Sequence, residues 1–398
     1  MPDAMDSSLK ADILKKIPED ISETYVERRG GRLNLYTDGY TPRFVLVSLN
    51  VEAILQETTI RRKGNRLDTI TDGLGLGGVY SETLGRIKEQ GGEKSRLGMA
   101  TLMWISHSER PLKVDELCHA LGVEIGSPDL DSDNIPSIGI LLACCQGLVV
   151  ADKEASTIRL FHFTLQEYLR THPEHFDRAH STMAETCLSY LNSGQIKALS
   201  TRPYPDLLNV GFLGYSFLYS DFPFLEYSSL HWGIHAKRDL SDCAKQLALT
   251  LFDDYSNHIS AQILLWERES RFIGVDFGKP FLPSGLHCAS FFGILEIVAS
   301  LVEAESCEIN QTEYAGSTPL VWASFNGHER VVKILLGQDD VDPDKPNRYG
   351  ETPLWYAAGG GHEGVVKLLL GRDDINPTYQ MTMAKHRSTT LPRMGMRE

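Results

Sequence analysis

The sequence predicts a mostly α-helical, multidomain protein in which a small α+β module precedes a helical linker and a solenoid of repeated helical units. The main observation is a repeat near the C-terminus: residues 318–329 recur as residues 352–363, and residues 331–337 recur as residues 365–371. This period of 34 residues is typical of stacked helical units, each too small to bury its apolar face alone. The second observation is a succession of three helical patterns and one hairpin pattern over residues 95–164, which predicts the α+β module.

Each copy of the repeat carries its own helix signals. Thr318 can cap free backbone N–H groups, and Pro319 suits the first helical position because an N–H would have no partner there. Gly327 favours a break after the first helix, since glycine adopts positive φ without strain. In the second helix, Val331 and Leu335 fall on one apolar stripe. The unit is therefore predicted to be a helix–turn–helix followed by a turn toward the next copy.

The unit resembles the ankyrin repeat, whose signature begins Thr-Pro-Leu-His. The histidine of that signature is Val321 in one copy and Trp355 in the next, so both copies lack the side chain that usually stabilises the turn. An earlier copy over residues 286–302 keeps the histidine as His287 and lacks the Thr-Pro pair. The resemblance implies about three ankyrin repeats over residues 281–380, the first of them degenerate. The polar composition after them predicts a disordered tail over residues 381–398.

Residues 93–170 are predicted to form a winged helix. Helical patterns cover residues 97–105, 114–121 and 136–146, and two strand patterns flank the polar turn at residues 153–156. A winged helix can read DNA with its third helix, but residues 138–146 contain no basic residue. Between positions 111 and 157, two basic residues stand against eight acidic ones, which would neutralise phosphates poorly. A packing and coupling role is therefore favoured over transcriptional control.

Motifs before the repeats resemble fungal NACHT–ankyrin proteins, which are STAND-type, signal-sensing NTPases. The motifs are L-G-R-I at residues 84–87, R-P-L-K-V-D-E-L at residues 110–117, and H-F-T-L-Q-E-Y-L at residues 162–169. In such proteins the winged helix is named after GPI inositol-deacylase, a label that implies no deacylase activity. The resemblance implies that residues 1–92 are a helical remnant of the end of a NACHT-type module and that residues 171–280 are a helical linker. The phosphate-binding motif G-x-x-x-x-G-K-S/T does not occur, so nucleotide hydrolysis is not expected of this sequence.

Composition restricts the classes of partner. A formal net charge of −14 disfavours a general affinity for nucleic acid or anionic membranes, because both require clustered Lys and Arg. The seven cysteines include no C-x-x-C pair, which is typical of reduced core residues in an intracellular protein. The N-terminus shows no apolar signal core, and the longest apolar run, residues 44–55, is too short to span a bilayer. We expect a cytoplasmic or nuclear protein whose partners include no nucleic acid and no membrane.

Other motifs are weaker candidates for chemistry. Residues 73–78 satisfy G-x-G-x-x-G but follow a basic polar segment rather than a buried strand, so a dinucleotide site is not indicated. His231 and His235 lie one helical turn apart, with Asp239 one turn further, yet their neighbour Trp232 favours packing over metal binding. No G-x-S-x-G motif is present for a hydrolase nucleophile. We predict a non-enzyme with no catalytic residue, no metal site and no cofactor.

The predicted function is binding of other proteins by the concave face of the repeats and their turns. The candidate contact residues are side chains expected to be exposed near the turns: Tyr314, Asp339, Asp340, Arg348, Tyr349 and Asp373. Their acidic members predict a partner with a basic patch. The alternative is that the chain is the regulatory and sensing arm of a nucleotide-dependent NACHT switch whose P-loop is absent from this sequence.

Overall fold

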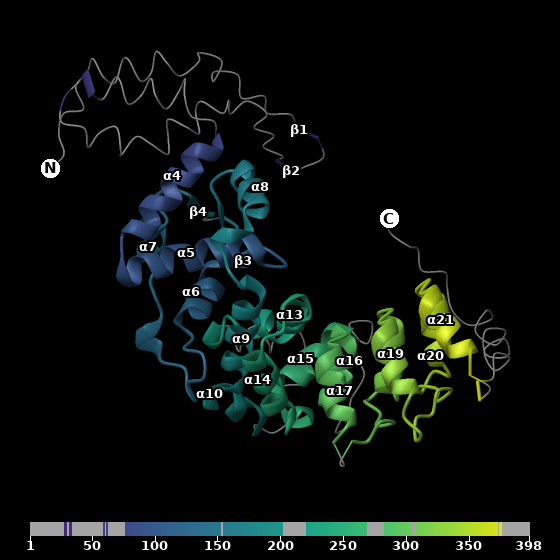
Figure 1. Cartoon of the computed structure of the whole chain (residues 1–398). Helices are drawn as coiled ribbons and strands as arrows, with labels where there is room; N and C mark the ends of the chain where they lie inside the picture. Colours follow the sequence, from purple (N-terminus) through teal and green to yellow (C-terminus); the bar gives the residue numbers. More distant parts are fainter. Residues whose placement is uncertain are drawn as a thin grey trace. The chain divides into compact units, whose positions relative to one another are not determined.

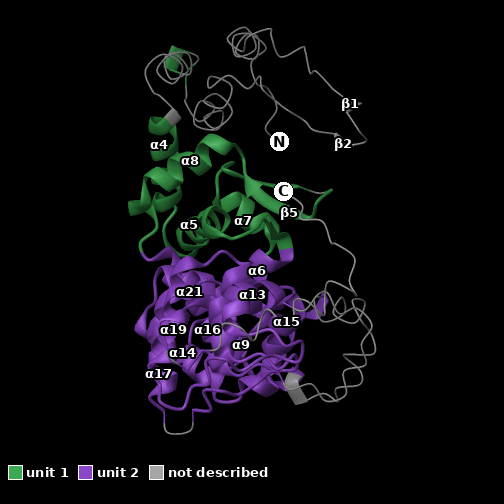
Figure 2. Cartoon of the chain, turned by 90° about the vertical axis from the view of Figure 1, so that its right-hand side faces the viewer, with its two compact units in different colours: residues 1–114, 137–177 green, residues 115–136, 178–398 purple. Residues whose placement is uncertain are grey.

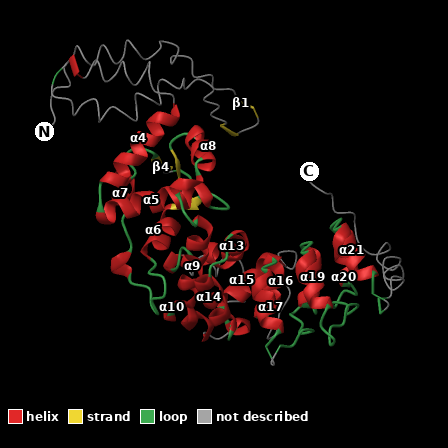
Figure 3. Ribbon diagram, viewed as in Figure 1, coloured by secondary structure: helices red, strands yellow, loops and turns green. Residues whose placement is uncertain are grey.

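The computed structural model describes residues 76–152, 154–201, 220–268, 282–304, 307–372 and 374–375, together with residues 28–29, 32–33, 59 and 61–62. These residues confirm the predicted mostly helical, multidomain architecture (Figures 1 and 3). Short strands β1 (Arg28–Arg29) and β2 (Arg32–Leu33) pair in antiparallel register. Most of the predicted helical remnant before residue 76 and the predicted tail over residues 381–398 lie outside the described residues. Within the described ranges, no helix is both long and apolar enough to cross a membrane.

The chain divides into two compact units, which Figure 2 shows in different colours. The first unit comprises residues 1–114 and 137–177, and the second comprises residues 115–136 and 178–398. The helices and strands described in the first unit, besides β1 and β2, are α4 (Leu76–Glu89), α5 (Gly92–His107), β3 (Leu112–Lys113), α7 (Ile138–Cys144), β4 (Val149–Asp152), β5 (Thr157–Leu160), α8 (Phe163–Thr171) and the 3-10 helix η3 (Pro173–His175).

The first unit has the three-stranded antiparallel sheet of a winged helix. Strand order is β3-β5-β4, and the predicted hairpin between β4 and β5 is confirmed, with Asp152 opposite Thr157. The sequence pattern missed β3, because two residues are too few to show an alternation of apolar and polar side chains. Tyr80, Leu84 and Ile87 lie on one face of α4 and are buried, and Tyr80 shares a hydrogen bond of 2.6 Å with Thr164 of α8.

The winged-helix segment is shared between the two units. Its second helix, α6 (Val114–Gly122), and the connection after it, with the 3-10 helix η2 (Ser132–Asn134), belong to the second unit from residue 115 onward. Hydrogen bonds to the linker account for the assignment of the connection after α6 to the second unit. Gly194 N–H donates to Pro128 O at 2.8 Å, and Leu130 N–H donates to Gln195 Oε1 at 2.9 Å.

The linker consists of helices packed around an aromatic core. Its elements are α9 (Ala179–Asn192), α10 (Gly194–Lys197), η4 (Ala198–Thr201), α13 (Leu225–Arg238), α14 (Asp242–Phe252), η5 (Tyr255–Asn257) and α15 (Ile259–Arg268). His235 is fully buried in α13, where Nε2 shares a hydrogen bond of 2.9 Å with the Tyr227 hydroxyl and Nδ1 one of 2.9 Å with His180. Among the described residues, no group of three His, Cys, Asp or Glu side chains could hold a metal ion.

Three helix pairs follow the linker and stack side by side (Figure 1). They are α16 (Gly285–Phe292) with α17 (Leu295–Val302), α18 (Pro319–Phe325) with α19 (Glu329–Leu336), and α20 (Pro353–Gly359) with α21 (Glu363–Leu370). The Thr318 side chain accepts a hydrogen bond from Val321 N–H, and Thr352 accepts one from Trp355 N–H, so the predicted caps are confirmed. In the first pair, which lacks Thr-Pro, Ser284 caps the helix instead.

Candidate protein-binding surface

The first helices of the three pairs, α16, α18 and α20, and the turns before them form one side of the array, which we call the first-helix face. Aromatic side chains concentrate on it. Phe325 and Trp355 are each 38% exposed, whereas Trp322 of α18 is fully buried. Tyr356 connects the two exposed rings, with centroid distances of 5.6 Å to Phe325 and 5.0 Å to Trp355. The face therefore presents a connected aromatic surface that is neither fully buried nor fully solvated.

The turns beside this surface are fixed by side-chain caps. The Glu313 carboxylate accepts hydrogen bonds from Ala315 N–H at 2.6 Å and Ser317 N–H at 3.1 Å. In the next repeat, Asn347 Oδ1 has the equivalent role and accepts hydrogen bonds from the N–H groups of Tyr349 and Glu351 at 2.9 Å each. Both turns are thus held by side-chain hydrogen bonds, and such preorganisation lowers the entropy lost on binding.

Neighbouring turns also contact each other. Arg348 N–H donates to Ala315 O at 2.8 Å, and the Arg348 guanidinium lies 4.8 Å from the centre of the Tyr314 ring. That distance is within the range of a cation–π contact. Two of the predicted binding residues, Tyr314 and Arg348, are therefore brought together, and exposed Tyr349 follows Arg348 in the same turn.

The acidic residues of the predicted site lie elsewhere in the unit. Asp339 and Asp340 are exposed and follow the second helix α19, where Asp340 O accepts a hydrogen bond from Asn310 Nδ2 at 2.6 Å. Asp373 lies outside the described residues. The prediction thus combined residues of the turns before the first helices with residues of the connections after the second helices.

Sequence reasoning missed the aromatic surface itself and one cation that lies against it. Arg268, the last residue of α15, lies 4.4 Å from the centre of the Trp322 ring and 3.8 Å from the Glu313 carboxylate. The sequence did contain one signal for the aromatic surface, because Trp355 occupies the position of the histidine in the ankyrin signature. No local signal pointed to Arg268.

Three histidines form hydrogen bonds between neighbouring repeats. His287 Nε2 donates to Ser317 O at 3.0 Å, and its Nδ1 accepts from Ser284 N–H at 3.2 Å. Burial lowers the pKa of His287 to about 3, and the nearby positive charge of Arg268 contributes to the shift. His328 and His362 each bind the preceding repeat through Nε2, to Phe291 O and Phe325 O respectively, at 2.9 Å. These rings are therefore structural.

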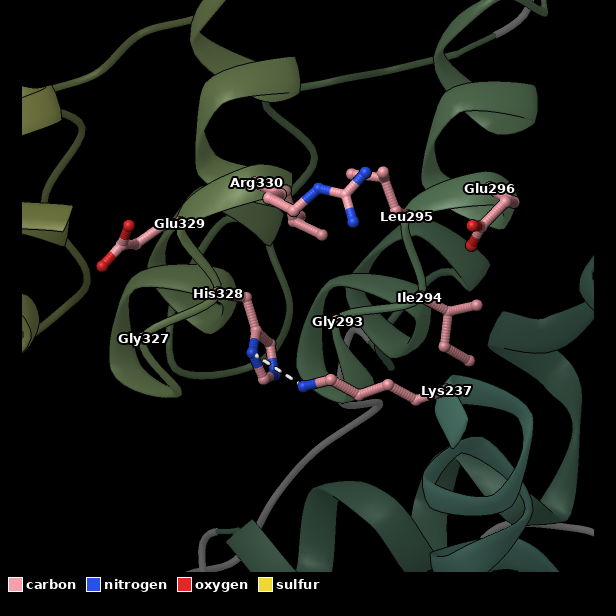
Figure 4. A pocket seen from close by; sticks show the side chains of 10 residues that line it. Lys237, Gly293, Ile294, Leu295, Glu296, Gly327, His328, Glu329 and Arg330 are labelled. Carbon is pink, nitrogen blue, oxygen red and sulfur yellow. Dashed lines mark hydrogen bonds between the residues drawn. The ribbon is translucent and has the colours of Figure 1, made fainter. Parts of the chain in front are cut away.

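A groove of about 350 Å³ lies where the N-terminal ends of α17 and α19 meet the end of α13 (Figure 4). Lys237 Nζ donates to His328 Nδ1 across it at 3.3 Å. Burial and the positive charge of Lys237 together lower the pKa of His328 to about 4, so the ring is a neutral acceptor. The other charged residues of the groove are Glu296, Glu329 and Arg330, a mixture that selects no ligand by charge.

Comparison with known proteins identifies two parts of the chain. The family model described as ankyrin repeats (3 copies) matches residues 286–380, and that described as GPI inositol-deacylase, winged helix domain, matches residues 87–185. A chain in the crystal structure of the yeast ribosomal protein Rps3 in complex with its chaperone Yar1 is 23% identical, and the match covers 33% of this chain and 97% of that one. Its TM-score of 0.25 is too low to support a functional inference. Among curated proteins, none matches this chain significantly.

Proposed function

We propose that this chain, which carries ankyrin repeats and a winged-helix domain, binds other proteins through its first-helix face and has no catalytic role of its own. The observation that carries the proposal is the pair of partly exposed rings, Phe325 and Trp355, on consecutive first helices. Aromatic side chains are enriched in the buried centres of protein interfaces and supply much of their binding energy. The capped turns with Tyr314, Arg348 and Tyr349 would form the rim of such an interface.

Quantitative affinity capture tests this proposal. The full chain, a Phe325→Ala/Trp355→Ala variant and a Phe163→Ala variant are compared for the proteins that they retain from the source cells. Phe163 is the matched control, because it is 74% exposed but lies on α8 in the winged-helix unit. We expect the double variant to lose at least one partner that the control keeps. If both variants retain the same partners as the unchanged chain, the first-helix face is not the binding surface.

The partners proposed here are proteins rather than nucleic acid or membranes, and the proposed compartment is the cytoplasm or the nucleus. The formal charge of −14 and the absence of basic residues from α7 support the first part. The cysteines support the second, since all seven are free thiols. Burial raises the pKa of Cys145 and Cys288 to about 12, which suits inert core thiols rather than reactive ones.

A second candidate function is the regulatory and sensing arm of a nucleotide-dependent NACHT switch. The match to the GPI inositol-deacylase type of winged helix favours it, together with the resemblance of the preceding motifs to NACHT–ankyrin proteins. Mapping the 5′ end of the native transcript tests it. A longer product that encodes G-x-x-x-x-G-K-S/T would support this candidate, whereas a transcript whose product starts at Met1 would favour a stand-alone adaptor.

A further inference from the structure

The guanidinium of Arg268 occupies a buried position on the first-helix face. Arg268 ends α15, the last helix of the linker, yet its side chain is only 5% exposed. It forms an ion pair of 3.8 Å with Glu313, whose side chain is fully buried. A buried charge requires such a partner, because transfer out of water is otherwise strongly unfavourable.

Three aromatic rings surround the same guanidinium. Its central carbon lies 4.4 Å from the ring centre of Trp322, 5.7 Å from that of Phe325 and 6.0 Å from that of Tyr356. All three distances fall within the range of cation–π attraction, which strengthens when the cation is desolvated. We call Trp322, Phe325, Tyr356 and Glu313 the guanidinium box.

The box is held in place independently of Arg268. The Glu313 carboxylate is fixed by the two N–H groups of its own turn. The Tyr356 hydroxyl donates to Glu351 Oε2 at 2.7 Å, which orients the ring and places a second carboxylate nearby. A planar, delocalised cation that stacks on aromatic rings and pairs with a carboxylate fits this arrangement, and arginine meets these conditions better than lysine.

The box is also continuous with the surface proposed to bind proteins. Phe325 is one of its walls and is 38% exposed, while Tyr356 contacts exposed Trp355. A ligand that approaches the exposed rings therefore reaches the box directly. In the first repeat, Cys288 takes the position of Trp322 and Tyr356, so that repeat has no aromatic ring at this position.

We propose that the guanidinium box is a recognition site for an arginine of a protein partner, and that Arg268 fills it in the absence of that partner. The partner inserts its own guanidinium between Trp322 and Glu313, and its apolar neighbours pack on Phe325 and Trp355. Arg268 then leaves the box, which frees the end of α15 from the repeats. This inference rests on the proposed function and specifies the chemistry of the partner as an arginine-bearing segment.

The test measures binding of N-acetyl-arginine methylamide to the full chain by NMR titration, with the neutral isostere N-acetyl-citrulline methylamide as the second probe. Arg268→Ala empties the box, and we expect it to bind the arginine probe at least tenfold more tightly than the unchanged chain. Arg238→Ala is the matched control, because Arg238 also ends a linker helix but is exposed. The control should behave like the unchanged chain, and the citrulline probe should bind to neither variant.

Arg268→Lys keeps the test decisive if Arg268→Ala does not fold. Its ammonium competes less well for the box, so a gain of several-fold in affinity for the arginine probe is expected. A folded variant at Arg268 that shows no gain, or that binds citrulline equally, overturns the proposal. Because this assay uses no protein partner, its failure leaves the capture result untouched. Conversely, if the Phe325→Ala/Trp355→Ala variant retains the same partners as its control while the chain still binds the arginine probe, that result contradicts only the proposed function.

Discussion

Alanine at Gly327 should destabilise the repeats by about 1 kcal/mol more than alanine at the equivalent Gly361. Both glycines have a φ of 70°, which costs an alanine about 1–2 kcal/mol. At Gly361 an added Cβ would meet no atom within 4 Å, so only this backbone cost applies. At Gly327 the Cβ would lie 2.5 Å from Nδ1 of His362, the ring that donates to Phe325 O. Displacing that ring removes a hydrogen bond worth about 1 kcal/mol, so Gly327→Ala should cost about 2–3 kcal/mol.

Native-state hydrogen exchange of the full chain measures this difference in α20 and α21. A difference of about 1 kcal/mol corresponds to a further loss of protection of roughly fivefold in Gly327→Ala relative to Gly361→Ala. His362→Ala supplies the internal control, because it makes room for the methyl group. In that background, Gly327→Ala should cost only as much as Gly361→Ala. Equal losses for the two glycine variants in the unchanged background would refute the steric reasoning.

Two further predictions concern buried charge in the second unit. Burial lowers the pKa of His258 and His328 to about 4 and that of His287 to about 3, from 6.5 in the unfolded chain. Their contribution to stability is therefore complete above pH 6.5 and is lost as the pH falls. Urea unfolding should show that the free energy of unfolding falls by up to about 1.4 kcal/mol per pH unit for each histidine as the pH approaches 5. A free energy of unfolding that does not change with pH would contradict burial of the neutral rings. Glu313→Gln should cost about 3 kcal/mol in hydrogen exchange of α18, because it removes one partner of a buried ion pair. Adding Arg268→Met should recover most of that loss, whereas simply additive costs would argue against the ion pair.

Local signals account for the elements that the sequence predicted well. The Thr-Pro pairs determine where α18 and α20 begin, since a hydroxyl cap and a proline at the first helical position act within one turn of the chain. The first repeat was recognised as degenerate, but its cap was not, because Ser284 replaces threonine and pairs with His287 in a capping box. Within the winged helix, the assignment of α6 to the second unit depends on contacts of Pro128 and Leu130 with the linker, and no periodicity records such contacts.

The candidate surface was less accessible to sequence reasoning, because its parts come from distant segments. Arg268 meets Glu313, Trp322 and Tyr356 across sequence separations that no short motif encodes. Expected exposure is a criterion that selects Tyr314 and Arg348 but overlooks Trp322, which is fully buried. Expected exposure therefore predicts the residues at the rim of a binding surface better than those at its centre.

The second repeat holds the following turn without the histidine of the ankyrin signature. In the first repeat, His287 binds the next turn through Ser317 O, whereas Val321 at the same position of the second repeat offers no such hydrogen bond. The following turn is held instead by Asn347, which binds its own backbone, and by Tyr356, which donates to Glu351. Because the turn before α20 is bound by Asn347 and Tyr356, it does not require a histidine in α18, and the apolar Val321 is buried at that position.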